Sequence, residues 1–311
     1  MYKVFIDGKE GTTGLRIYER LAQRDDLSLI VLDEEKRKDQ AARRAALNAA
    51  DVAFLCLPDA AAREAVSLIE NDTTRVIDAS TAHRTLPGWC YGLPELGETF
   101  FETLKTSRRT AVPGCHASGF ISLVYPLVAA GILPADADIT CHSITGYSGG
   151  GKKMIAQYED AGRSPLLDAP RQYGLTQQHK HLKEMQAVCG LTKAPIFCPI
   201  VSDFYSGMAV TVPLFAGMLK PGYTVKDIRE VYRALYAGPV VRYAEEPGED
   251  GFLAANAVMG RDSMQVSVMG NEERILLVSR FDNLGKGASG AAVECMNIML
   301  GDDPTHGLDL I

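Results

Sequence analysis

The chain has 311 residues, which is enough for two domains of ordinary size. Its apolar fraction of 46% and charged fraction of 23% are typical of a globular protein, and its net charge of −7 argues against a nucleic-acid-binding protein. No apolar run approaches the ~20 residues that span a bilayer, and the first residues lack the features of a secretory signal. Seven scattered cysteines, an odd number, indicate free thiols, so we expect a cytoplasmic protein. Because no apolar run is long enough to span a bilayer, we expect no membrane contact.

The first third of the chain alternates short apolar strands with helical patterns. Strands are predicted at residues 4–6, 27–32, 52–57 and 75–78. One helix follows the first strand with Leu15, Tyr18 and Leu21 in phase, and Asp59 is expected to be the N-cap of another. This alternation predicts a parallel sheet that is covered by helices on both faces.

A glycine-rich turn joins the first strand to the first helix, with the spacing Gly-x-x-Gly-x-x-Gly. Such a turn lays the pyrophosphate of a dinucleotide against the N-terminus of a helix. We therefore predict cofactor contacts from Gly8, Gly11, Thr12, Thr13 and Gly14. The alternative is a tight turn with a purely structural role.

A charged run, residues 33–38, follows the second strand. An acidic residue in this place binds the ribose 2′-hydroxyl of NAD, whereas a basic one accommodates the 2′-phosphate of NADP. Asp33 and Glu34 would favour NAD, and Lys36, Arg37 and Lys38 would favour NADP, so the spacing does not decide between the cofactors. A solvated charge run remains the other interpretation.

Cys115 follows a strand pattern at 109–112 and the break Pro113-Gly114. A long helical pattern then begins, with residues 120, 123, 124, 127 and 128 on one face. Cys115 is therefore predicted at a helix N-terminus, where the dipole favours a reactive thiolate and free N–H groups can hold an oxyanion. A buried cysteine in a turn is the alternative.

The second half of the chain has a different pattern. Strands are predicted at 210–215 and 264–269, and a turn at 270–273 leads into a hairpin partner at 274–281. Thr224 is expected to cap a helix whose apolar stripe ends at Leu235. This half is predicted to form a mixed or antiparallel sheet with helices on one face.

Two histidines, His179 and His181, stand in a polar stretch before a short helical pattern. Imidazole titrates near neutral pH and can act as an acid or a base beside a thiol. Cys189 and Cys198 are nearby, but the spacing matches no common zinc pattern, so we predict no metal. Surface histidines without a function are the other possibility.

Two further glycine-rich segments could approach an anion. The first, Gly146 to Lys153, is expected to contact a phosphate or the cofactor through Ser148, Gly149 and Lys152. The second opens the last helix and contains Asn283 and Lys286. The alternative for the second is a helix start that packs closely on another element.

Taken together, these segments resemble the short form of N-acetyl-γ-glutamyl-phosphate reductase, from arginine biosynthesis, over essentially the whole chain. The motifs that carry the resemblance are the glycine turn, Asp78 to Arg84, Tyr91 to Leu96, Pro113-Gly114-Cys115, the Gly146 loop, His179-Lys180-His181 with Glu184, and Gly285 to Ala288. The resemblance implies NADPH-dependent reduction of N-acetyl-γ-glutamyl phosphate to the semialdehyde, with release of phosphate. After the cysteine, this chain has His116-Ala117-Ser118 where longer members have Tyr-Pro-Thr, which leaves the role of His116 open.

The resemblance also implies the architecture and the roles of residues. We expect an α/β protein with a Rossmann-type NADP-binding domain at 1–114 and an α+β catalytic domain at 115–284, like those of glyceraldehyde-3-phosphate and aspartate-semialdehyde dehydrogenases. A C-terminal helix within 285–311 is expected to pack back on the first domain. Cys115 would be the nucleophile and His181 its acid–base partner, with His179 as competitor or substrate ligand.

The interpretation also includes contacts with the cofactor and the substrate, and an oligomeric state. NADP(H) would be held by the glycine turn, Lys36, Arg37, Ser148, Gly149, Asn283 and Lys286, and the substrate by Ser80, Arg84 and Lys152. We expect a homo-oligomer, either a dimer or a tetramer. The rival interpretations are an aspartate-semialdehyde dehydrogenase and a dinucleotide-binding regulator without turnover.

Overall fold

The computed structural model describes residues 1–311, and the chain divides into two units. The first unit comprises Met1–Pro94, Glu98–Pro113 and Ala288–Leu308. The second comprises Glu95–Gly97, Gly114–Gly287 and Asp309–Ile311. The two units are described in turn.

The first unit is built on a six-stranded parallel sheet in the order β2-β1-β3-β4-β6-β5. Its strands are β1 (Tyr2–Asp7), β2 (Leu27–Ile30), β3 (Val52–Leu55), β4 (Arg75–Asp78), β5 (Cys90–Tyr91) and β6 (Arg109–Ala111). The chain moves to β2 on one side of β1 and to β3 on the other. This reversal is the switch point where doubly wound sheets bind their ligands. The predicted parallel sheet is confirmed, and β2 and β3 each end two residues before the prediction.

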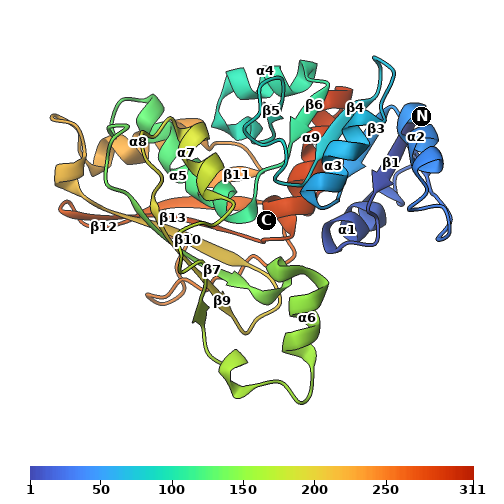
Figure 1. Ribbon diagram of the computed structural model, residues 1–311. Coiled ribbons are helices and arrows are strands. Elements are labelled where there is room, and N and C mark those ends of the chain that lie inside the picture. The colour runs from blue at the N-terminus through green and yellow to red at the C-terminus, as the bar shows by residue number, and fades with distance from the viewer. The chain divides into compact units, whose positions relative to one another are not determined.

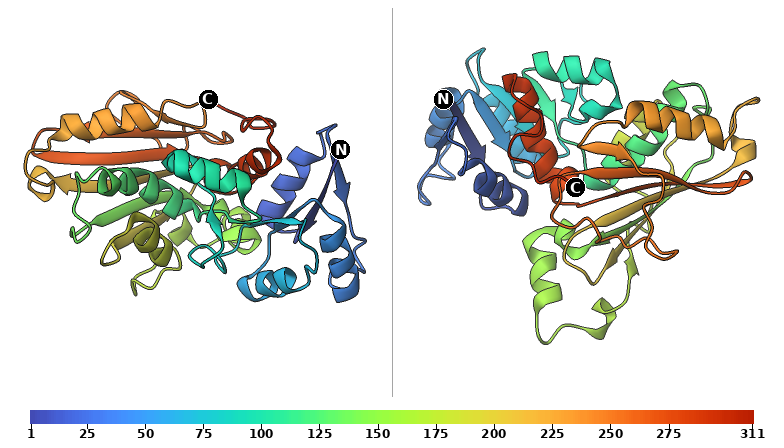
Figure 2. Two further views of the ribbon diagram at one scale, coloured as in Figure 1. Left: turned by 90° about the horizontal axis from the view of Figure 1, so that it is seen from above. Right: turned by 180° about the vertical axis from the view of Figure 1, so that it is seen from behind.

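Both faces of this sheet are covered, as predicted. Alternate residues of β1 separate two apolar cores: Val4 and Ile6 pack with α1 and α9, and Phe5 packs with α2 and α3. The helices are α1 (Thr12–Leu21), α2 (Gln40–Ala49), α3 (Asp59–Ser67), α4 (Glu98–Thr106) and α9 (Gly290–Leu300). The C-terminal helix α9, red in Figures 1 and 2, therefore lies against strands from the start of the chain.

Two details of the sequence prediction for this unit are wrong. The buried face of α1 is formed by Gly14, Ile17 and Leu21, while Leu15 is exposed. At 3.6 residues per turn, residues six apart such as Leu15 and Leu21 point about 120° away from each other. Asp59 is the first residue of α3 rather than its N-cap, which is Pro58. The Asp59 carboxylate instead accepts hydrogen bonds from the backbone N–H and hydroxyl of Thr81.

The second unit contains a seven-stranded mixed sheet in the order β11-β12-β13-β10-β7-β9-β8. Its strands are β7 (Thr140–Gly146), β8 (Arg171–Gln172), β9 (Ile196–Ser202), β10 (Met208–Phe215), β11 (Val241–Tyr243), β12 (Met264–Gly270) and β13 (Arg274–Phe281). The predicted hairpin is confirmed, since β12 and β13 pair antiparallel. The strands β7 and β9 pair parallel, which makes the sheet mixed.

Helices α5 (Cys115–Ala129) and α8 (Val225–Leu235) pack on this sheet and on each other, and α7 (Leu182–Cys189) packs on α5. The predicted cap of α8 is confirmed, because Thr224 and Asp227 form a capping box. Helix α6 (Gly151–Glu159) packs on β9, where its Tyr158 meets Val201. The short helical turns of the chain are Pro94–Leu96, Tyr147–Gly150, Pro165–Leu167, Ala216–Met218 and the π-helical Gly285–Ser289.

None of the helices combines the length and the apolar character that crossing a membrane requires.

Candidate active site

Cys115 is the first residue of α5, as the sequence predicts. Gly114 is the N-cap residue, and its lack of a side chain means that no side-chain cap occupies the helix start. The thiol is half-buried, whereas almost all of α5 behind it is buried. The Cys115 thiol therefore stands at the positive end of a helix dipole that is shielded from water.

The turn before Cys115 is fixed by Glu184 of α7. The backbone N–H of Gly114 donates to Oε2 of Glu184 at 3.1 Å. Glu184 is only 2% exposed, so this bond is made away from solvent. A buried hydrogen bond between an amide and a carboxylate is one of the stronger kinds, and here it holds the turn that precedes Cys115.

His179 and His181 lie beside each other, just before α7. Their ring centroids are 4.7 Å apart at nearly a right angle, and Nδ1 of His179 accepts a hydrogen bond from the backbone N–H of His181 at 3.2 Å. The ring of His116, the residue after the cysteine, lies 5.8 Å from His179 and 5.6 Å from His181. The two predicted histidines thus form a cluster with the start of α5.

His116 itself is buried and both of its ring nitrogens have hydroxyl partners. Nδ1 lies 2.6 Å from Oγ of Ser143, and Nε2 lies 2.6 Å from the hydroxyl of Tyr173. Burial lowers the pKa of His116 to about 3, and the nearby charges of His179 and Lys180 add to the effect. His116 is therefore a neutral imidazole at physiological pH and is not available as a proton donor.

Tyr173 and Ser143 are site residues that the sequence did not reveal. Tyr173 follows the edge strand β8 and is 57 residues from His116 in the chain, and Ser143 is in the middle of β7. No periodicity or motif distinguishes them. Only the parallel pairing of β7 with β9 and the antiparallel pairing of β8 with β9 bring them to α5.

Gly287 packs directly against Cys115. A Cβ at this position would lie 3.0 Å from Cβ of Cys115 and 3.1 Å from the carbonyl oxygen of Asp282. Gly287 belongs to the π-helical segment before α9, a geometry that is frequent at functional sites. Gly287 therefore lets this segment approach Cys115 closely. This agrees with the alternative interpretation of the segment as a helix start that packs closely on another element.

The first unit has a cavity of about 500 Å³ beside the glycine turn. Gly8 and Gly11 line it, and α1 starts at Thr12 without a side-chain cap. Gly8 has φ +88°, and a Cβ there would lie 2.4 Å from the carbonyl oxygen of Cys56. A Cβ at Gly14 would lie equally close to the carbonyl oxygen of Gly8, so both positions require glycine. The free N–H groups at the start of α1, including those of Thr12 and Thr13, suit a pyrophosphate.

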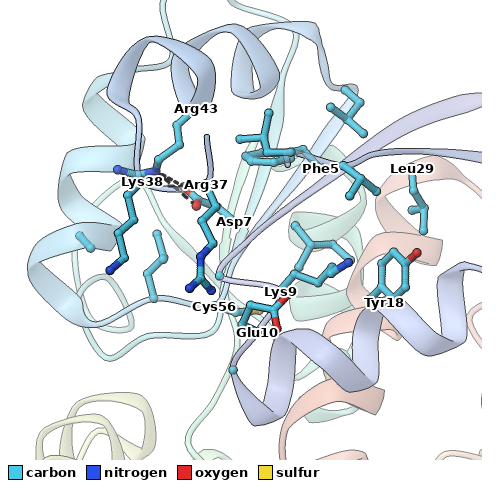
Figure 3. A pocket seen from close by; sticks show the side chains of 18 of the residues that line it. Phe5, Asp7, Lys9, Glu10, Tyr18, Leu29, Arg37, Lys38, Arg43 and Cys56 are labelled. Atoms are coloured by element: carbon cyan, nitrogen blue, oxygen red, sulfur yellow. Dashed lines mark hydrogen bonds and ion pairs between the residues drawn. The ribbon is translucent and has the colours of Figure 1, made fainter. Parts of the chain in front are cut away.

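The basic run after β2 contributes unequally to this cavity. Arg37 and Lys38 line it, beside the buried ion pair of Arg43 with Asp7 (Figure 3). Burial raises the pKa of Asp7, although the hydrogen bonds from Arg43 act in the opposite direction. Lys36 is not a lining residue, and its exposed ammonium lies 3.8 Å from Asp33.

Ser80 and Arg84 belong to the loop after β4 in the first unit. The Ser80 hydroxyl donates to the buried carboxylate of Asp78, which also contacts Nδ1 of His83. Arg84 donates to the backbone carbonyl oxygens of Val112 and Ala79. The two hydrogen bonds from Arg84 connect the end of β4 with the end of β6.

Three of the predicted cofactor residues meet in the second unit. Asn283 donates through Nδ2 to Oγ of Ser148, and Gly149 lies against the same amide group. Lys286, by contrast, is buried, and its ammonium lies 2.6 Å from Oε1 of Glu95. Lys152 is exposed in the first turn of α6.

Two protein families match the chain. Residues 3–103 match the "Semialdehyde dehydrogenase, NAD binding domain" and residues 115–283 match the "Semialdehyde dehydrogenase, dimerisation domain". The second match begins at Cys115.

The similar proteins agree with these matches. The chain is 46% identical over 318 residues to "N-acetyl-gamma-glutamyl-phosphate reductase 2" of Nostoc sp., covering 98% of this chain and 99% of that one. It is 44% identical over 311 residues to the protein of the same name from Pseudomonas putida, covering 98% of both. Among solved structures, aspartate semialdehyde dehydrogenase II of Vibrio cholerae shares the fold with a TM-score of 0.72 at 16% identity, covering 97% of this chain and 99% of that one. This chain belongs to the N-acetyl-gamma-glutamyl-phosphate reductase family, within the semialdehyde dehydrogenases.

Proposed function

We propose that the chain catalyses the NADPH-dependent reductive dephosphorylation of N-acetyl-L-glutamyl 5-phosphate to N-acetyl-L-glutamate 5-semialdehyde, in arginine biosynthesis. The observation that carries this proposal is the half-buried thiol of Cys115 at the start of α5, in a chain whose relatives bear the name of that reductase. An acyl phosphate has a good leaving group but is a poor direct acceptor of hydride. A thiolate divides this difficult reaction into two easier steps.

In the first step, the Cys115 thiolate attacks the acyl carbon of the substrate. A carbon–sulfur bond forms, the bond from carbon to the phosphate oxygen breaks, and inorganic phosphate leaves. The N–H groups at the start of α5 stabilise the negative oxygen that develops on the acyl carbon. NADPH, when bound, supplies the hydride that reduces the resulting thioester carbonyl. Cleavage of the carbon–sulfur bond then releases the aldehyde and regenerates the thiolate.

His181 is our choice for the acid–base group. It assists the deprotonation of Cys115 and protonates the oxygen anion that develops during reduction. His179, whose ring lies against that of His181, is the competitor for this role or a ligand of the substrate. His116 is excluded from proton donation, since it stays neutral and both of its ring nitrogens have partners.

The cavity beside the glycine turn supports binding of the cofactor, because Gly8 and Gly11 line it and the start of α1 has no side-chain cap. Gly8, Gly11, Thr12, Thr13 and Gly14 would hold the pyrophosphate through backbone N–H groups. Arg37 would pair with the 2′-phosphate, with Lys36 as a weaker candidate. The cofactor role of Ser148, Gly149, Asn283 and Lys286 stays a prediction.

We also propose residues that bind the substrate, an oligomeric state and a cellular location. Ser80, Arg84 and Lys152 remain candidates for binding the substrate's anionic groups. We propose a homo-oligomer, a dimer or a tetramer, since the match to a dimerisation domain covers residues 115–283. The free state of all seven cysteines supports a cytoplasmic location.

An assay of NADPH consumption with two acyl phosphates tests the proposed function. N-acetylglutamyl phosphate and aspartyl phosphate are compared at matched concentrations, with phosphate release measured in parallel. We expect turnover with the first and a much lower kcat/KM with the second. Preference for aspartyl phosphate would identify the rival dehydrogenase, and no turnover with either would refute the proposed reaction.

A further inference from the structure

A buried ion pair joins two sequence motifs of the second unit. Glu95 belongs to the helical turn Pro94–Leu96, and Lys286 belongs to the π-helical segment Gly285–Ser289. The Lys286 side chain is completely buried, and its ammonium lies 2.6 Å from Oε1 of Glu95. The pair therefore connects two segments that are 191 residues apart in the chain.

The two charges of this pair depend on each other. A buried ammonium is costly unless an opposite charge compensates it, and Glu95 supplies that charge from a side chain that is 16% exposed. The second carboxylate oxygen of Glu95, Oε2, is buried without a hydrogen-bond partner. The contact with Lys286 is thus the hydrogen bond that holds the Glu95 carboxylate in place. A change in length or charge on one side of the pair is therefore expected to move the other side.

The backbone around Lys286 is fixed from two directions. Oδ1 of the buried Asp282 accepts hydrogen bonds from the backbone N–H groups of Leu284 and Gly285, at 2.7 and 3.0 Å. The carbonyl oxygen of Asp282 accepts from the N–H of Gly287 at 2.9 Å. These bonds hold the segment to the end of β13, while the side chain of Lys286 holds it to a different element.

Gly287, the next residue, connects this segment to Cys115. A Cβ at Gly287 would lie 3.0 Å from Cβ of Cys115 and 3.3 Å from the ring of Phe281. The Gly287 backbone therefore covers one side of Cys115. Because neighbouring Cα atoms are held about 3.8 Å apart by the peptide unit, a displacement of the Lys286 backbone also moves Gly287.

We propose that Glu95 and Lys286 are positioning residues, and that their ion pair keeps Gly287 against Cys115 and thereby fixes the place of the thiol. This inference rests on the proposed function only in taking Cys115 as the reacting residue. It gives Lys286 a task other than the cofactor contact that the sequence predicts. It also gives a task to the motif Tyr91 to Leu96, which the proposed reaction does not use.

Two other roles of the pair have different consequences. If Lys286 contacts the cofactor, its loss weakens NADPH binding and leaves the free thiol unchanged. If the pair acts on the thiol through its electric field, loss of the positive charge and loss of the negative charge shift the pKa of the thiol in opposite directions. A positioning role predicts instead that changes on either side of the pair affect Cys115 in the same direction.

The first experiment uses Glu95→Asp, which keeps both charges and shortens the acidic side chain by one methylene. The ammonium then has to move to keep its contact, and the backbone of Gly285–Ser289 moves with it. Alkylation of Cys115 by iodoacetamide is followed over pH in the full chain, without substrate or NADPH, and the Cys115 peptide is quantified by mass spectrometry. The plateau rate at high pH reports access to the thiolate, and the midpoint reports its charge environment.

We expect Glu95→Asp to raise the plateau rate several-fold and to leave the midpoint unchanged, because Gly287 no longer covers the thiol fully. With substrate, kcat is expected to fall ~10-fold, since a small misplacement of the reacting atom is enough to slow the reaction. The dissociation constant of NADPH, measured by fluorescence titration, is expected to stay at the native value.

The second experiment removes the charges. Glu95→Gln and Lys286→Met are each expected to raise the plateau rate, because each leaves the other charge buried and unpaired. The double variant Glu95→Gln/Lys286→Met is expected to return toward the native plateau, since two neutral side chains of similar volume can pack together. If a single charge variant does not fold, Glu95→Asp and the double variant decide the question, because neither leaves an unpaired charge.

The matched control is Glu249→Asp. Glu249 pairs with Arg280, whose side chain is also nearly completely buried. Arg280 is in β13, and the backbone of this strand is held by pairing with β10 and β12 rather than by the ion pair. We expect Glu249→Asp to leave the alkylation plateau unchanged.

A native plateau rate in folded Glu95→Asp would overturn the proposal. Opposite midpoint shifts in Glu95→Gln and Lys286→Met, with native plateaus, would replace it by an effect of charge alone. A raised dissociation constant of NADPH in Lys286→Met, with native alkylation, would make Lys286 a cofactor ligand instead. The alkylation assay contains no substrate, so absence of turnover in the NADPH-consumption assay of the native protein would refute the proposed reaction alone.

Discussion

Gly287 packs against Cys115, and a side chain at position 287 would compete with that of Cys115 for space. A Cβ there would lie 3.0 Å from Cβ of Cys115, a distance tighter than nearly all real Cβ contacts. The carbonyl oxygen of Asp282, 3.1 Å from the same point, prevents the new methyl group from moving the other way. The position of the Cys115 sulfur therefore depends on Gly287, a glycine 172 residues further along the chain.

We predict that Gly287→Ala displaces the nucleophile by a few tenths of an ångström. Small misplacements of a reacting atom reduce rates strongly, so kcat is expected to fall ~10-fold or more, while overpacking costs about 1–3 kcal/mol of stability. Steady-state kinetics and urea unfolding measure the two effects. Gly217→Ala is the control, because a Cβ at Gly217 meets no atom within 4 Å. Equal kcat in Gly287→Ala and the native protein would show that the contact does not position the thiol.

Variants of His179 and His181 are expected to differ in their steady-state kinetics. His181→Asn should mainly lower kcat, since a proton donor acts in the transition state, while His179→Asn should mainly raise KM if that residue only binds substrate. One limb of the pH–rate profile should disappear in His181→Asn and persist in His179→Asn. The reverse pattern would exchange their roles. No change in either variant would place the proton source elsewhere.

The basic run after β2 is expected to discriminate between the two nicotinamide cofactors. Arg37→Ala should raise KM for NADPH ~10-fold while changing KM for NADH little, because only NADPH carries the 2′-phosphate. Lys38→Ala should act in the same direction, since Lys38 also lines the cavity. Lys36→Ala should have a smaller effect in the same direction, because the Lys36 ammonium is exposed beside Asp33. Equal effects on both cofactors would mean that the 2′-phosphate is held by other residues.

Burial of neutral His116 predicts a specific acid sensitivity of the fold. The pKa of His116 is about 3 in the folded protein, below the ~6.5 of an unfolded histidine, so the unfolded state binds the extra proton. This contribution to stability is complete above pH ~6.5 and is lost as the pH falls from there toward the folded value. The loss for this one group is at most about 1.4 kcal/mol per pH unit.

Urea unfolding at several pH values between 7.5 and 4.5 measures this effect. The native protein is expected to lose stability on acidification faster than His116→Gln, which has no titrating ring at that position. Parallel curves for the two proteins would contradict the assignment of a neutral, buried His116.

The sequence predicts the features that depend on local patterns. The break at Pro113-Gly114 locates Cys115 at a helix start, and the glycine turn after β1 locates the start of α1 beside a cavity, because both follow from the preferences of a few adjacent residues. The pair of histidines is recognisable for the same reason. The alternating strands likewise predict the parallel sheet of the first unit.

Features that depend on distant pairings could not be predicted. Tyr173 and Ser143 become part of the site only through strand pairings that the sequence does not specify. The burial of Lys286 beside Glu95 is likewise determined by tertiary structure.

The central claim is that Cys115 forms a covalent acyl-enzyme. It is tested most directly by mixing the protein with N-acetylglutamyl phosphate without NADPH and mapping any adduct by mass spectrometry. We expect one N-acetylglutamyl group on the Cys115 peptide, removed when NADPH is added, and none on Cys115→Ser, whose turnover should fall by several orders of magnitude because a serine hydroxyl is far harder to ionise than a thiol. A folded Cys115→Ser protein with near-normal turnover, or an adduct on another residue that NADPH discharges, would contradict this account.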